Sequence, residues 1–70
     1  MKLKKKNVDA WLARDKNGLL TIFFYKMPHL VDNCIWFPYD DVYGCTLLDI
    51  ESFPDVTFEN SPVKVSITKP

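Results

Sequence analysis

The sequence predicts a mainly β protein built on a small antiparallel sheet of three to five strands. A β-hairpin pattern covers residues 8–26, and an alternating strand pattern covers residues 63–68. Between them, prolines and a glycine divide the chain into pieces too short for a long helix, because proline lacks a backbone donor and fixes φ. We therefore expect an irregular middle with at most one short helical turn.

Length and composition indicate one folded domain. The chain has 70 residues, 47% of them hydrophobic and ten of them aromatic, with a formal net charge of zero. A domain of this size buries only about 60% of the surface that its unfolded chain exposes, so large rings must supply much of the core. Disordered chains combine low hydrophobicity with high net charge. We expect a single domain over residues 1–70, with residues 1–6 as a flexible basic arm.

The first hairpin joins an alternating segment, residues 8–14, to a β-branched and aromatic segment, residues 19–26. Two turns fit the residues between them. Asn17 and Gly18 could form a type I′ turn, or Asp15 could open a type I turn with Gly18 in a G1 bulge. Gly18 supplies the positive φ in both. We favour the bulge, because the Asp15 carboxylate can accept backbone N–H groups within the turn.

Two strands then define the sheet. Residues 19–25 are apolar on both faces, which predicts a central strand. Residues 63–68 alternate apolar and polar side chains, typical of a strand with one buried face. We expect the hairpin and this last strand at the heart of the sheet. An exposed edge strand could pair with a second copy of itself and form a homodimer.

The middle of the chain yields only short elements. Residues 34–37 and 43–48 are each compatible with a short strand, and residues 56–58 with another extended piece. Asp49 can cap one helical turn that ends before Pro54, because its carboxylate can accept the first free backbone N–H groups.

The residues that carry chemistry are few and poorly spaced. His29 is the one histidine, and neither Cys34 nor Cys45 stands at a spacing typical of zinc ligands. Gly18 and Gly44 are the two glycines, too few for a phosphate-binding loop. We expect two free thiols, no metal, no cofactor and no catalytic activity.

Nothing in the sequence predicts a membrane segment. The longest apolar runs, residues 22–25 among them, are far below the roughly 18 residues of a membrane span. The basic start is followed by Asn7, Asp9 and Arg14, which interrupt any signal-peptide core. With two cysteines, the chain suits a reducing compartment. The expected location is the cytoplasm.

The zero net charge conceals an uneven distribution. Residues 1–30 hold seven basic and two acidic side chains, whereas residues 31–62 hold seven acids and no Lys or Arg. Aromatic residues interleave with these acids, a composition suited to a surface that meets a basic protein. The candidate partner surface comprises Asp32, Trp36, Asp40, Asp41 and Tyr43. The leading hypothesis is thus a small protein-interaction or accessory module.

The alternative hypothesis is a nucleic-acid-binding protein. Lysines near the N-terminus could contact phosphates, at positions Lys2, Lys4, Lys5 and Lys6. Trp11, Phe23 and Tyr25 could stack on bases if their face of the sheet were open. A basic stripe on a folded face is the usual footprint of such proteins, and here only a basic terminus is visible. A protein partner is therefore favoured over nucleic acid.

The segment Trp11-Leu12-Ala13-Arg14-Asp15-Lys16-Asn17-Gly18 resembles the W-x-A-R-D-K-[DN]-G opening of small uncharacterised proteins of gut anaerobic bacteria. The likeness continues at Lys26 and Pro28, at residues 53–59, which are similar to the F-P-[DE]-V-x-[WF]-E segment of those proteins, and at Pro62. The chain departs from the pattern at Phe58, where tryptophan is common, at Met27, inserted before Pro28, and at residues 60–61, where acids usually follow.

The resemblance implies a bacterial cytoplasmic protein, with a mobile element as its expected carrier, and it brings no known activity. It draws attention to Arg14 and Asp15 beside the hairpin turn. We expect Asp15 to shape the turn and Arg14 to pair with a carboxylate such as Glu59.

Overall fold

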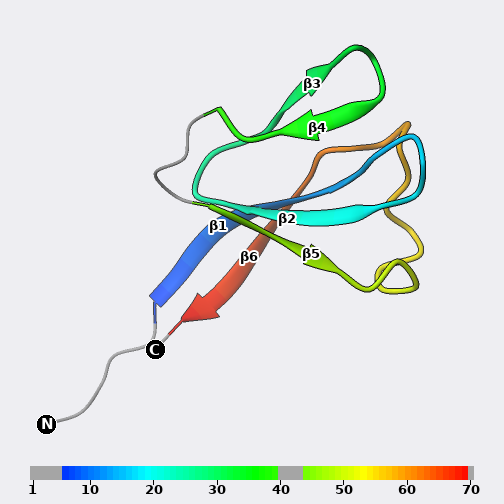
Figure 1. Ribbon diagram of the computed structural model, residues 1–70. Helices are drawn as coiled ribbons and strands as arrows, with labels where there is room; N and C mark the ends of the chain where they lie inside the picture. The colour runs from blue at the N-terminus through cyan, green and yellow to red at the C-terminus, as the bar shows by residue number, and fades with distance from the viewer. Residues whose placement is uncertain (1–5, 40–43, 70) are drawn as a thin grey trace, which may run out of the picture.

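Over residues 6–39 and 44–69, the part of the chain that the computed structural model describes, the protein forms six β-strands that pair antiparallel (Figure 1). The strands are β1 (Lys6–Arg14), β2 (Leu20–Phe24), β3 (His29–Val31), β4 (Ile35–Phe37), β5 (Cys45–Leu48) and β6 (Val63–Lys69). Four of them form one sheet in the order β5-β2-β1-β6, and β3 pairs with β4 in a separate hairpin. The mainly β, antiparallel class is confirmed. Of the arm expected over residues 1–6, only Lys6 is described, as the first residue of β1.

The turn between β1 and β2 is the type I turn with a bulge. Gly18 has a φ of 100°, and its N–H donates to the Asp15 carbonyl over 2.9 Å. The Asp15 N–H in turn donates to the Leu19 carbonyl over 2.8 Å. The expected local role of the Asp15 carboxylate is wrong, because the Asn17 side chain accepts the Leu19 N–H instead. The Asp15 carboxylate is thereby left to bind outside the turn.

The strand order confirms one expected position and corrects another. β2 is central, between β5 and β1, as its two apolar faces predict. β6 pairs with β1 alone and lies at the edge of the sheet rather than at its heart. The reason is that β5 occupies the free side of β2, so the connection over residues 49–62 crosses to the opposite border before β6 begins.

Both faces of the sheet bury side chains. On one face, Leu12 and Leu20 form a core with Val56 from the connection between β5 and β6. Phe23 points to the opposite face, because its position differs from that of Leu20 by an odd number of residues, and it is only 2% exposed. Pro28, just before β3, is also fully buried. The sheet therefore carries buried side chains on both of its faces.

The expected short strands of the middle segment are found with tighter bounds. The strand expected over residues 34–37 is β4, and the one expected over 43–48 is β5, with residue 43 outside the described residues. β5 follows Gly44, whose carbonyl accepts the Phe24 N–H.

The connection over residues 49–62 contains turns and no helix. The Asp49 carboxylate accepts the Glu51 N–H over 2.9 Å, as its capping role predicts, and the Ser52 N–H donates to the Asp49 carbonyl, which closes one turn that does not continue as a helix. The extended piece expected over residues 56–58 is wrong. The Thr57 N–H donates to the Asn60 side chain, and the Asn60 N–H donates back to the Thr57 hydroxyl, which folds this stretch into a turn.

Candidate functional site

The β3–β4 hairpin carries the described part of the expected partner surface. Asp32 lies exposed in its turn, and Trp36 lies on β4. Asp40, Asp41 and Tyr43 lie outside the described residues. Asp32 and Asn33 have φ values of 53° and 57°, and the Cys34 N–H donates to the Val31 carbonyl. These are the features of a type I′ turn, and Asp and Asn tolerate its positive φ better than other non-glycine residues.

Trp36 holds the hairpin to the rest of the protein. Its backbone N–H donates to Asp15 Oδ1 over 2.9 Å, and nearby the Lys16 N–H donates to the Cys34 carbonyl over 2.9 Å. The Trp36 side chain is half-buried, and its Nε1 is buried with no partner within residues 6–39 and 44–69. Trp36 therefore packs against the protein and anchors the hairpin, rather than offering a freely exposed side chain to a partner.

Replacing Asp15 by alanine should loosen this anchor. The Trp36 N–H would lose a charged acceptor, and such hydrogen bonds contribute about 1.5–3 kcal/mol. We expect faster amide hydrogen exchange in β3 and β4 and a smaller change in β6. Asp15→Asn keeps an oxygen acceptor and should lose less stability. Equal exchange rates in the alanine variant and the wild type would contradict the role of Asp15.

Aromatic and aliphatic side chains gather on the outer side of this hairpin. We call Ile35, Phe37 and Tyr39 the hairpin face; they are 38%, 47% and 65% exposed. Ile35 and Phe37 point the same way because they are two residues apart in β4. The Tyr39 ring lies 4.6 Å from that of His29, which pairs with Phe37 across the strands. The hairpin face is an exposed apolar surface on a firmly anchored support.

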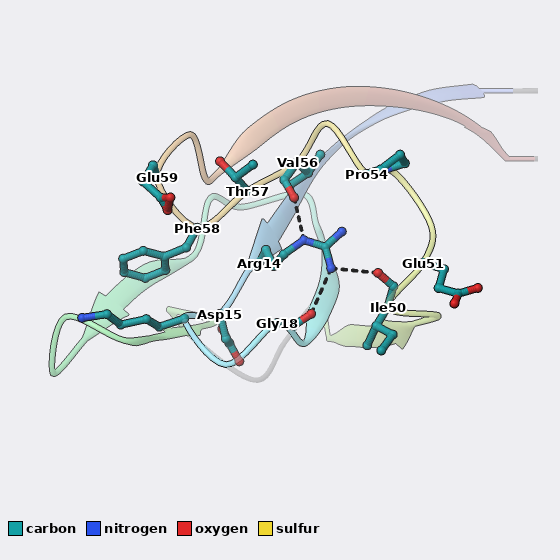
Figure 2. A pocket seen from close by; sticks show the side chains of 11 residues that line it. Arg14, Asp15, Gly18, Ile50, Glu51, Pro54, Val56, Thr57, Phe58 and Glu59 are labelled. Atoms are coloured by element: carbon teal, nitrogen blue, oxygen red, sulfur yellow. Dashed lines mark hydrogen bonds between the residues drawn. The ribbon is translucent and has the colours of Figure 1, made fainter.

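Arg14 forms the most elaborate polar contact of the described structure (Figure 2). All five guanidinium N–H groups donate to backbone carbonyls, at distances of 2.6–3.2 Å, those of Gly18, Ile50, Ser52, Phe53 and Val56. The expected pairing with Glu59 is wrong. A planar fork of five donors fits a ring of carbonyls, and the connection after β5 curls around Arg14 to supply four of them.

An open depression of about 400 Å³ lies around this contact. Arg14, Lys16, Phe58 and Glu59 are among the residues that line it. Arg14 has no donor left for an anionic ligand, because its five N–H groups are used. The depression is therefore better explained as the outer surface of a structural junction than as a ligand site.

The described residues assemble no group of three or more His, Cys, Asp and Glu side chains able to hold a metal ion. Cys34 is half-buried and Cys45 exposed, and both are free thiols. No helix in the described part of the chain is long and apolar enough to cross a membrane.

The aromatic residues considered for base stacking are only partly accessible. Phe23 is buried and has no face to offer a base, which corrects its place in that set. The ammonium of Lys64 lies 5.8 Å from the centre of the Trp11 ring. Tyr25 is exposed. Lys2, Lys4 and Lys5 lie outside the described residues.

Fold and site together define a small antiparallel β protein with a rigid arginine-centred junction and an exposed, aromatic β-hairpin. No protein-family model matches the chain, and searches of curated proteins and of solved structures find no similar chain.

Proposed function

We propose that this chain is a small protein-interaction module without catalytic activity, which binds a basic protein through the hairpin face. The observation that carries the proposal is the exposure of Ile35, Phe37 and Tyr39 on an anchored hairpin. Exposed apolar patches are commonly contact sites, and aromatic residues are enriched in the cores of protein interfaces.

Anchoring strengthens the case for the hairpin face. Two hydrogen bonds fix β4 and its turn to residues 15 and 16 at the end of β1. A surface held in one conformation loses less entropy on binding than a mobile loop. Phe37 is the natural central contact, because it lies between Ile35 and Tyr39 and is paired with His29.

Charge indicates the kind of partner. Residues 31–62 contain seven acids and no Lys or Arg, and exposed Asp32 lies at the tip of the hairpin. A partner with a basic rim around an apolar centre would complement this surface and associate faster at low salt. A bacterial cytoplasm, as the resemblance implies, is the proposed setting.

The test compares proteins captured from a lysate of a gut anaerobic bacterium by the immobilised full chain and two variants. Phe37→Asp places a charge in the hairpin face. Ile50→Asp makes the same kind of change at an exposed apolar residue outside it. We expect the wild type and Ile50→Asp to retain the same basic protein, Phe37→Asp to retain at least about tenfold less, and added salt to release it. Circular dichroism verifies that each variant is folded.

Three outcomes would overturn the proposal. One is equal capture by Phe37→Asp and the wild type, and another is capture that salt does not weaken. The third is loss of all captured protein after nuclease treatment, together with a gel shift of nucleic acid at low salt, which would favour the nucleic-acid alternative.

A further inference from the structure

β6 offers an unpaired edge to the solvent. It runs over seven residues, pairs with β1 on one side only, and forms the border of the sheet (Figure 1). Apart from the β1 ladder, no backbone hydrogen bond within the described ranges reaches residues 63–69. A row of free N–H and C=O groups of this length is a template for another strand.

One of the two lysines of β6, Lys64, does not protect this edge in the usual way. A lysine on an edge strand opposes pairing by its charge. The ammonium of Lys64 lies 3.8 Å from Asp9 Oδ2 and over the Trp11 ring, both on β1. Lys64 is thus directed toward its own sheet, with most of its side chain still exposed, rather than projecting past the border.

Pairing of β6 with itself has one register that uses the whole strand. Ser66 is the middle residue of Val63–Lys69, so an antiparallel pair centred on Ser66 brings all seven residues opposite one another. In that register Val65 lies opposite Ile67 of the second copy, and Lys64 lies opposite Thr68. No two lysines are opposed, and the half-exposed Val65 and Ile67 side chains gain apolar neighbours.

We propose that two copies of this chain pair through β6, antiparallel and centred on Ser66, to form one continuous eight-stranded sheet. This goes beyond the proposed function, because it concerns the sheet border opposite β5 and not the hairpin face. The dimer presents two hairpin faces on one rigid support, and bivalent attachment raises the apparent affinity for a partner with two sites.

Sedimentation equilibrium of the full chain and two variants tests the proposal. Ser66→Lys places two lysines opposite each other at the twofold axis, while its exposed position leaves the protomer intact. Thr46→Lys makes a matched change at an exposed position of β5, the other edge. We expect a mass of twice the 8.2 kDa chain for the wild type and for Thr46→Lys. For Ser66→Lys we expect a dimer dissociation constant at least about tenfold higher, because like charges in directly opposed positions are destabilising.

High salt separates electrostatic from structural effects. It should partly restore the Ser66→Lys dimer, since salt screens the introduced repulsion. The proposal is overturned by a monomeric wild type, or by a dimer that Thr46→Lys disrupts and Ser66→Lys does not. A dimer lost in Phe37→Asp but kept in Ser66→Lys would place the contact on the hairpin face and likewise exclude β6. Phe37→Asp leaves β6 unchanged, so its effect on capture of the protein partner tests the proposed function whether or not the β6 dimer forms.

Discussion

Replacing Arg14 by alanine is expected to lower the free energy of unfolding by about 3–5 kcal/mol. Arg14 makes five hydrogen bonds to carbonyls, and a hydrogen bond to a charged group contributes about 1.5–3 kcal/mol. The contributions are less than additive, because the acceptors share one guanidinium and several are partly exposed. In a domain of this size each kcal/mol moves Tm by about 4–8 °C, so thermal unfolding followed by circular dichroism should show a fall of at least about 12 °C.

Two variants control for charge and for position. Arg14→Lys keeps the charge but replaces a planar fork with a point charge and three rotatable donors, so most of the stability should still be lost. Lys16→Ala removes an exposed neighbouring charge and should change stability by no more than about 0.5 kcal/mol. An unchanged Tm in Arg14→Ala would refute the structural role of Arg14.

The Arg14 contact also joins two segments that lie far apart in the sequence, residues 11–18 and 53–59. Arg14 lies in residues 11–18, and the carbonyls of Phe53 and Val56 lie in residues 53–59. Phe53 has a φ of 50°, a costly conformation for a bulky residue. The bond to Arg14 helps to hold it there. On this interpretation the residues of these two segments maintain the fold.

Replacing Phe23 by alanine should cost about 3–5 kcal/mol, the range for large-to-small changes at buried aromatic residues. Phe23 is 2% exposed and lies on the central strand, opposite Trp11 on β1. Removing the ring leaves a cavity, and a core this small has few other side chains that could move in to fill it. Urea denaturation measures the loss from the shift of the midpoint at unchanged slope.

Phe37→Ala is the matched control, because it removes the same side chain from the half-exposed hairpin face. It should lose less than about 1 kcal/mol. If Phe23→Ala were no more destabilising than Phe37→Ala, the face of β2 that carries Phe23 could not be part of the core.

The sequence alone was sufficient for the elements whose signals are local. Alternation predicted the strands that became β1 and β6, and the two apolar faces of residues 19–25 predicted β2. Gly18 marked the turn because its positive φ is costly for most other residues. The hairpin turn at Asp32 and Asn33 had a recognisable signal as well, since both residue types tolerate positive φ.

The tertiary structure decided which side chains and backbone groups bind one another when they lie far apart in the sequence. Arg14 was expected to find a carboxylate, and it binds carbonyls up to 42 residues away. The Asp15 carboxylate was expected to bind within its own turn, and it accepts the backbone N–H of Trp36, 21 residues away. Every residue carries the same carbonyl and, proline apart, the same N–H, so no residue type marks which of them will meet a given side chain. Alternation and turn propensity are properties of neighbouring residues, whereas the Arg14 junction, the anchored hairpin and the edge position of β6 exist only once the chain has closed on itself.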